Sequence, residues 1–236
     1  MTSGLFVVLQ KEFVDQLTNR RFLTIFALFL IISAIGVHDG ADQYNNMLAS
    51  YAQRMQSISS DTQIPGYMPE IPSPLIIFTK MTDYFVMFGV FLGIAMGFDL
   101  ISKEKETRSL RTLLSHPVFR DEIVNGKAIA SALILAIALG ATIAVSVAIL
   151  LIMGIIPTAD ELCAILLFAG ISTMFVLTYF SLALMMSTVA PDSGTALIST
   201  LAIFLLLSSA VPILGWTAAE MIAGSPPALP ADAQGS

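Results

Sequence analysis

The chain has 236 residues, of which 56% are hydrophobic and 12% are charged, and its mean hydropathy is +0.84. Soluble domains carry about 25% charged residues, so this composition excludes an ordinary soluble domain and indicates an integral membrane protein. The formal net charge of −6 gives no sign of nucleic-acid binding, because the positive charges do not form a basic face. The single cysteine, Cys163, excludes an intrachain disulfide framework.

The first 21 residues place apolar side chains four positions apart, at Leu5, Leu9, Phe13 and Leu17, with polar residues between them. This spacing is typical of one apolar stripe along a helix. We expect residues 1–21 to form an amphipathic helix that lies in the membrane interface and leads into the first span.

Long apolar runs then alternate with polar segments, which predicts an all-α, polytopic membrane helix bundle. The transmembrane region is expected over 22–214. Its five predicted spans are 22–37, 81–101, 128–156, 162–189 and 196–214. Between them we expect an external loop over 38–80 and a cytoplasmic segment over 102–127, followed by a re-entrant or disordered tail over 215–236.

Two of the predicted spans carry small residues every fourth position, a spacing that lets a second helix approach closely. Plain helix packing explains these stripes better than a ligand site does. The predicted packing residues are Gly89, Gly93 and Gly97 in the second span, and Ala136, Gly140 and Ala144 in the third.

The distribution of Lys and Arg predicts the orientation, since cytoplasmic segments are enriched in them. With the amino terminus inside, nine of the eleven lie on the cytoplasmic side, and only Arg54 and Lys80 lie outside. We therefore expect a multi-pass protein of the plasma membrane with a cytoplasmic amino terminus. Five spans would leave the carboxyl terminus outside.

Several function classes lack their sequence signals. The middles of the five runs hold no ionisable residue, which disfavours a proton- or ion-coupled transporter. Ser102 to Lys105 matches the short pattern SxxK, but so short a match is common by chance, and we expect no catalytic residue.

Binding motifs for phosphate and metal are also incomplete. Gly126 and Lys127 lack the other residues of a phosphate-binding loop. His38 and His116 fall on opposite sides of the membrane, and the methionines are scattered, so we expect no metal site and no cofactor in this chain.

The most distinctive stretch is the polar segment between the second and third runs, because it holds six of the eleven Lys and Arg residues. Leu110, Leu113 and Leu114 follow its first charges, and Pro117 comes shortly after them, which predicts a short amphipathic helix that ends before the proline. The leucines need an apolar partner. One alternative is that they dip into the membrane interface while the charged residues stay solvated.

This segment resembles the pattern E-R/K-E-x-G-T-L-x-x-L-L-S-x-P-V-S-R, followed by Gly-Lys, of the type-2 ATP-binding-cassette permeases. The matching residues are Lys103, Glu104, Lys105, Glu106, Leu110, Leu113, Leu114, Ser115, Pro117, Val118, Arg120, Gly126 and Lys127. Within that family the chain is most similar to the permeases that serve maturation of nitrous-oxide reductase and multicopper enzymes. It departs from the pattern where Arg108 and Ser109 replace Gly-Thr, and where five runs stand in place of the family's six spans.

The resemblance implies the membrane subunit of an ATP-driven exporter that works with a separate ATPase subunit and a second permease chain, as a homo- or heterodimer. ATP and Mg²⁺ would bind the partner ATPase, so the chain itself would not be an enzyme. The implied docking residues, on the coupling helix and beside it, are Glu104, Glu106, Arg108, Leu110, Arg111, Leu113, Leu114, Pro117, Arg120, Gly126 and Lys127. An alternative is a membrane scaffold that binds the ATPase without forming a full pore.

Overall fold

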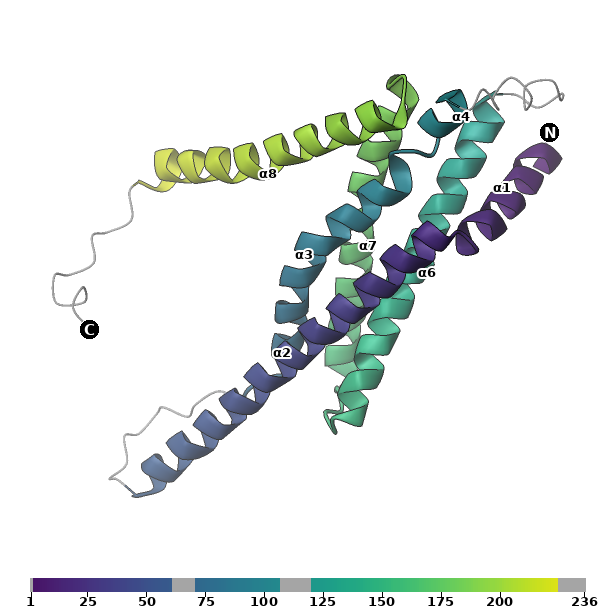
Figure 1. The fold of residues 1–236 in the computed structure, drawn as a ribbon. Helices are drawn as coiled ribbons and strands as arrows, with labels where there is room; N and C mark the ends of the chain where they lie inside the picture. The colour runs from purple at the N-terminus through teal and green to yellow at the C-terminus, as the bar shows by residue number, and fades with distance from the viewer. Residues whose placement is uncertain (1, 61–70, 107–119, 225–236) are drawn as a thin grey trace.

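The computed structural model describes residues 2–60, 71–106 and 120–224, with side chains for 9–56, 71–106, 123–222 and 224. In these parts of the chain, every regular element is an α-helix (Figure 1). The helices are α1 (Thr2–Leu17), α2 (Arg20–Ser60), α3 (Leu75–Gly97), α4 (Ser102–Glu106), α6 (Arg120–Ile152), α7 (Ala159–Val189) and α8 (Ser193–Ala223).

Five of the described helical stretches are long and apolar enough to cross a membrane. The all-α architecture and the presence of five candidate spans are therefore confirmed within the described residues. These stretches are Arg20–Gln56, Leu75–Glu106, Ile123–Ile152, Ala159–Val189 and Ser193–Ile222.

Helix α2 is much longer than the first predicted span. It runs for 41 residues, which corresponds to about 60 Å of helix and about twice the hydrocarbon thickness of a bilayer. The segment from His38 onward, predicted as part of an external loop, is thus a direct continuation of the spanning helix as far as Ser60. No helix-breaking residue falls between Phe22 and Ser60 except two glycines, Gly36 and Gly40.

Those two glycines are sites of close packing. A Cβ on Gly36 would lie 2.8 Å from the Tyr84 ring, and one on Gly40 would lie 2.8 Å from the Ile77 Cα. Both neighbours belong to α3, so the glycines let α2 cross α3 at short range. The conformational cost of glycine inside a helix is offset here by interhelical contact.

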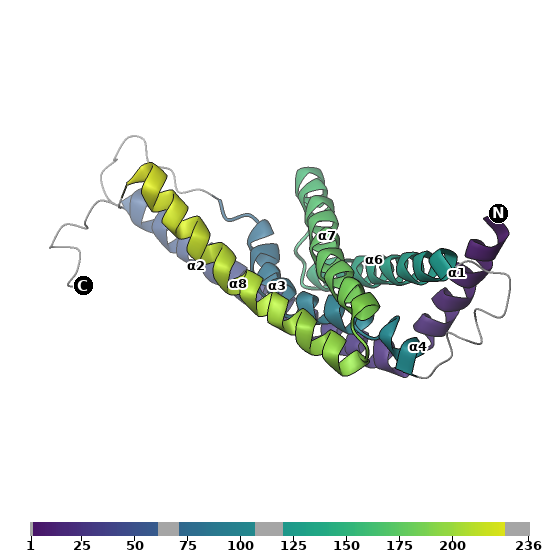
Figure 2. The same ribbon diagram turned by 90° about the horizontal axis from the view of Figure 1, so that it is seen from above.

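The core lies between α2, α3, α6 and α7, and α1 packs along α6 (Figures 1 and 2). Its fully buried side chains include one from each of α2, α3, α6 and α7, namely Val37, Met81, Leu135 and Val176. Edge-to-face rings tie three helices together, because Phe85 lies 5.0 Å from Phe29 and 5.7 Å from Phe168 between ring centroids. Such aromatic pairs add to the free energy gained from burial alone.

The predicted glycine stripe of α3 lies against α7. A Cβ added to Gly93 would meet the Val176 carbonyl oxygen at 2.6 Å, and one added to Gly97 would meet the Phe180 carbonyl oxygen at 2.7 Å. The corresponding stripe of α6 is different, because Gly140 has no atom within 4 Å of such a Cβ and Ala144 is exposed. Within this chain, the second predicted stripe does not pack a helix at Gly140.

Helix α8 projects away from the other helices (Figures 1 and 2). Ala196 and Thr200 are its buried residues, and every described side chain from Val211 to Ile222 is exposed. The helix is continuous from Ser193 to Ala223 with Pro212 inside it. The structure therefore differs from the expected span ending at 214, since the first part of the predicted tail, 215–223, belongs to the same helix.

Candidate functional site

The short helix α4 forms a polar junction where the polar segment of the sequence begins. Helix α3 ends at Gly97, and a turn leads into α4, with the backbone N–H of Leu100 donating to the Gly97 carbonyl oxygen at 3.4 Å. The predicted second span extended to Ile101, so the structure ends that helix one turn earlier. This turn directs α4 toward the ends of α6, α7 and α8 (Figure 1).

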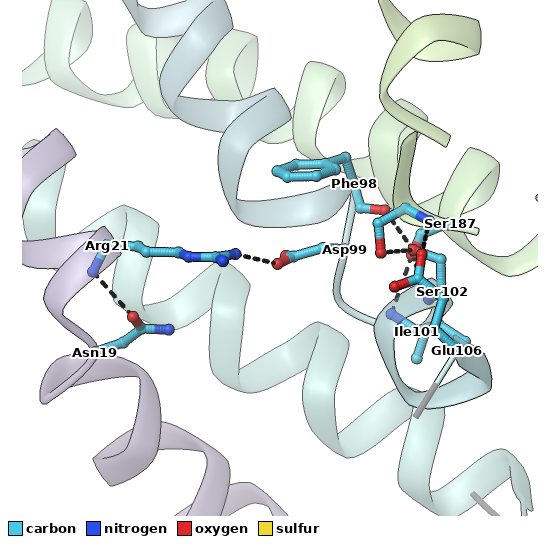
Figure 3. A network of polar contacts seen from close by, with 9 residues as sticks. Asn19, Arg21, Phe98, Asp99, Ile101, Ser102, Glu106 and Ser187 are labelled. Carbon is cyan, nitrogen blue, oxygen red and sulfur yellow. Dashed lines mark hydrogen bonds and ion pairs between the residues drawn. The ribbon is translucent and has the colours of Figure 1, made fainter. Parts of the chain in front are cut away.

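Ser102 and Ser187 connect the start of α4 to α7. The Ser187 hydroxyl accepts from the backbone N–H groups of Ile101 and Ser102, both at 3.0 Å, and donates to the Ser102 hydroxyl at 3.2 Å. Ser102 in turn donates to the Phe98 carbonyl at 2.9 Å (Figure 3). Both serines are fully buried, and a buried, satisfied network of this kind fixes one arrangement of its members. The Ser102–Lys105 pattern is thus part of a structural junction.

Lys105 and Glu106 cap two successive helices. The Lys105 ammonium donates to the carbonyl oxygens of Thr188 and of Ala190, the latter at 3.0 Å, where α7 ends. The Glu106 carboxylate accepts from the backbone N–H of Ser193, the first residue of α8. A cation at a carboxyl end and an anion at an amino end both complement the helix dipole. Two adjacent side chains of α4 therefore bind the two ends of the α7–α8 turn. The cation contacts the carboxyl end of α7, and the anion contacts the amino end of α8.

Lys127 joins α4 to α6 and α1. Its ammonium lies 2.8 Å from a carboxylate oxygen of Glu12 and 2.8 Å from one of Glu104. The side chain of Lys127 is 9% exposed and each carboxylate side chain is 17% exposed. In so dry a setting, charge-assisted hydrogen bonds are stronger than at a surface. One buried ammonium thus links α6 to the preceding described helix, α4, and to the amino-terminal helix α1.

A second link between the amino-terminal part and the junction is an ion pair at the start of α2. The Arg21 guanidinium lies 3.2 Å from the Asp99 carboxylate, and the Asn19 side chain accepts from the Arg21 backbone N–H at 3.0 Å (Figure 3). Arg21 is 69% exposed, so this pair contributes little to stability. The pair connects the start of α2 to the turn between α3 and α4.

The α7–α8 turn is also capped from within. The Asp192 carboxylate accepts from the Thr195 backbone N–H at 2.7 Å and from its hydroxyl at 2.7 Å. These bonds lower the pKa of Asp192 below its ordinary value, the backbone donor contributing most. Asp192 is therefore the N-cap of α8, and it prefers the ionised form.

The predicted docking residues lie partly inside and partly outside the part of the chain that the structure describes. Glu104 and Lys127 form an ion pair inside the chain, and the predicted place of Glu104 at the polar rim of an ATPase contact stays a prediction. Glu106 caps α8, and Gly126 is buried beside Lys127. Arg120 begins α6, with its side chain outside the described part. The remaining six residues also lie outside the described residues: Arg108, Leu110, Arg111, Leu113, Leu114 and Pro117.

Sequence reasoning missed most partners of this junction. Ser187, Ser193 and Glu12 carry no local motif, and each meets α4 or Lys127 across more than 80 residues of chain. The available signal was indirect, since a lysine at the start of an apolar run needs a counter-charge. The sequence alone does not say which of the many carboxylates supplies it.

Comparison with known proteins identifies the family. The search of curated proteins gave no match. A family model described as ABC-2 family transporter protein matches residues 6–230, which include most of α1, the five apolar helices and the α4 junction. The chain is therefore a membrane protein of the ABC-2 transporter family.

Proposed function

We propose that this chain is the membrane permease subunit of an ATP-driven exporter, driven by a separate ATPase subunit that docks on residues 102–127. The observation that carries the proposal is the α4 junction. Four residues of α4, namely Ser102, Glu104, Lys105 and Glu106, contact α6, α7 and α8 directly. The stretch 107–119, with the leucines of the predicted coupling helix, follows α4 immediately in the chain.

This arrangement suits the transmission of force. A force applied to 107–119 reaches α4 on one side and α6 on the other, because both are covalently continuous with that stretch. From α4, the capping contacts of Lys105 and Glu106 extend to the α7–α8 turn, and the Lys127 ion pairs extend to α1. Short polar contacts, which are buried around Ser187 and Lys127, favour movement as a unit over independent fraying. ATP-dependent motion of a docked subunit would thereby be distributed to α1, α6, α7 and α8.

The partner ATPase would bind ATP and Mg²⁺, and this chain would contribute no catalytic residue.

A second permease chain is part of the proposal. Helix α8 leaves most of its apolar surface without intrachain contacts, and Gly140 and Ala144 present small residues on an open face of α6. Close approach of a second copy along small residues is a common way to associate helices in membranes.

Co-purification with the candidate ATPase tests the docking assignment. The double variant Leu113→Asp/Leu114→Asp places two charges where an apolar insertion into the ATPase is proposed, so association should fall at least tenfold. A matched control, Ile71→Asp/Ile156→Asp, changes two exposed residues at the opposite end of the bundle and should leave association unchanged. Equal association of the wild-type chain and the leucine variant would remove the docking segment from the proposal.

A further inference from the structure

A cleft opens on the surface between the α1–α2 connection and the last turns of α3. Its volume is about 570 Å³. Most of its wall is apolar, with the side chains of Phe22 and Ile25 on α2 facing Ala95 and Met96 on α3, and with Phe98 and Leu100 beyond them. Such a wall can receive a hydrocarbon chain.

The rim of the same cleft is basic. Arg20, Arg21 and Asp99 are the charged residues that line it, which leaves one net positive charge. Asp99 is paired with Arg21, but that guanidinium is 69% exposed and has further N–H donors. The Arg20 side chain is exposed and has no ion-pair partner among the described residues. Two guanidinium groups at one rim fit a phosphate diester, which accepts paired N–H donors.

The cleft also lies at the depth where a headgroup would be. Arg20 and Arg21 begin the first spanning helix and follow the amphipathic helix α1, and Asp99 lies just past the end of α3. The apolar wall extends from this boundary into the spanning part of α2 and α3. A ligand that fits must therefore combine an anionic head at the interface with a chain that enters the apolar layer.

We propose that this cleft binds one anionic phospholipid, with its phosphate on Arg20 and Arg21 and an acyl chain along Phe22, Ile25, Ala95 and Met96. The lipid joins α1, α2 and α3 at the edge of the junction described above, although it is separate from the docking segment. The proposal does not depend on the transported substrate or on the ATPase.

Native mass spectrometry of the full chain tests this, with phosphatidylglycerol and phosphatidylcholine of matched acyl chains added in equal amounts. We expect one tightly held phosphatidylglycerol per chain and a preference of at least fivefold over phosphatidylcholine. Arg20→Gln should abolish that preference while leaving the Arg21–Asp99 pair intact. Ala95→Phe should fill the cleft and reduce retention of both lipids at least fivefold, with folding checked by circular dichroism.

Lys11→Gln is the matched control, because Lys11 is an exposed cation on the same side of the chain that does not line the cleft. It should keep the preference. Equal loss in Lys11→Gln and Arg20→Gln would mean that general surface charge attracts the lipid, and would overturn the proposal. Displacement by water-soluble glycerophosphoglycerol at equal concentration would show that the site takes a phosphate alone and would overturn the role of the wall. A lipid-free dimer that dissociates in Arg20→Gln would assign the cleft to a second copy instead.

Discussion

Lys127 is the residue whose removal tests the junction most simply. Lys127→Met deletes the ammonium that neutralises Glu12 and Glu104 and leaves two carboxylates close together in a poorly hydrated place. Breaking a buried ion pair by removing one partner costs about 3–5 kcal/mol. We expect a loss of that order, seen as a lower midpoint of thermal unfolding in detergent or nanodiscs.

Two further variants test whether the loss of stability comes from the two unpaired carboxylates or from the changed side-chain shape. Lys11→Met removes an exposed lysine and should change the midpoint little. The triple variant Glu12→Met/Lys127→Met/Glu104→Met replaces the whole charged group by apolar side chains and should recover most of the lost stability. If the triple variant is less stable than Lys127→Met alone, the carboxylates have other roles that the ion pairs do not explain.

Asp192 gives a pH-dependent prediction at the start of α8. Its hydrogen bonds to Thr195 lower its pKa in the folded chain, so its stabilising contribution is complete above the ordinary pKa of an aspartate. That contribution is lost as the pH falls through the lowered, folded-state pKa. Asp192→Ala should therefore unfold at a lower temperature than the wild-type chain at pH 7, and the difference should shrink below about pH 4. A difference that stays constant from pH 7 to pH 3 would contradict an ionised cap.

At the scale of helices, Gly93 on α3 and Gly140 on α6 can be compared, because the first is closely packed and the second is open. Gly93→Ala would place a methyl group 2.6 Å from the Val176 carbonyl oxygen, whereas Gly140→Ala would meet nothing within 4 Å. Alanine is the better helix former by about 1 kcal/mol, so Gly140→Ala should be neutral or stabilising. Gly93→Ala should destabilise by about 1–3 kcal/mol, because α3 and α7 must separate.

Thermal unfolding of the two variants in the same detergent provides the measurement. The predicted signs are opposite, which makes a general effect of glycine replacement easy to recognise. A stabilising Gly93→Ala would mean that α3 and α7 are not held at this close distance.

The elements themselves were largely predictable, for a physical reason. A bilayer requires about 20 consecutive apolar residues per helix, so runs such as Ala128–Ile156 and Leu162–Val189 are visible in the sequence. Helix starts were less accurately predicted, since the capping box of Thr158 and Glu161 begins α7 at Ala159, before the predicted span of 162–189. The sequence did not indicate where α2 ends, because a helix can continue beyond its apolar part. The half of α2 beyond His38 is too polar to resemble a span, yet nothing in it breaks the helix.

The junction was only partly predictable for a different reason. The charge density of 98–127 identified the segment, but it gave no partners. Glu104 was expected to face an ATPase, which stays a prediction. The structure adds an ion pair between Glu104 and Lys127, because a buried lysine requires a counter-charge. Contacts such as Lys105 with the Ala190 carbonyl depend on how α7 and α8 are arranged, and single-sequence patterns do not contain that information.

At the scale of the whole molecule, the open face of α6 predicts association between two copies. Gly140→Leu adds a large side chain to a face that has no intrachain neighbour, so the single chain should fold normally. In liposomes, it should lower the fraction of dimers at least fivefold, because small residues are what permits close helix approach. Gly170→Leu, at an equally open position on α7, is the control. Equal dimer fractions in both variants and the wild-type chain would exclude this face as the contact.

We propose that an ATPase acts on this chain through the segment beside α4. The most direct measurement is the rate of ATP hydrolysis by the candidate ATPase in nanodiscs that contain no permease, the wild-type chain, or Leu113→Asp/Leu114→Asp. We predict that the wild-type chain changes the hydrolysis rate at least threefold relative to empty nanodiscs, and that the double variant does not. The same rate in all three preparations, with the chain folded and present in each loaded disc, would contradict the account.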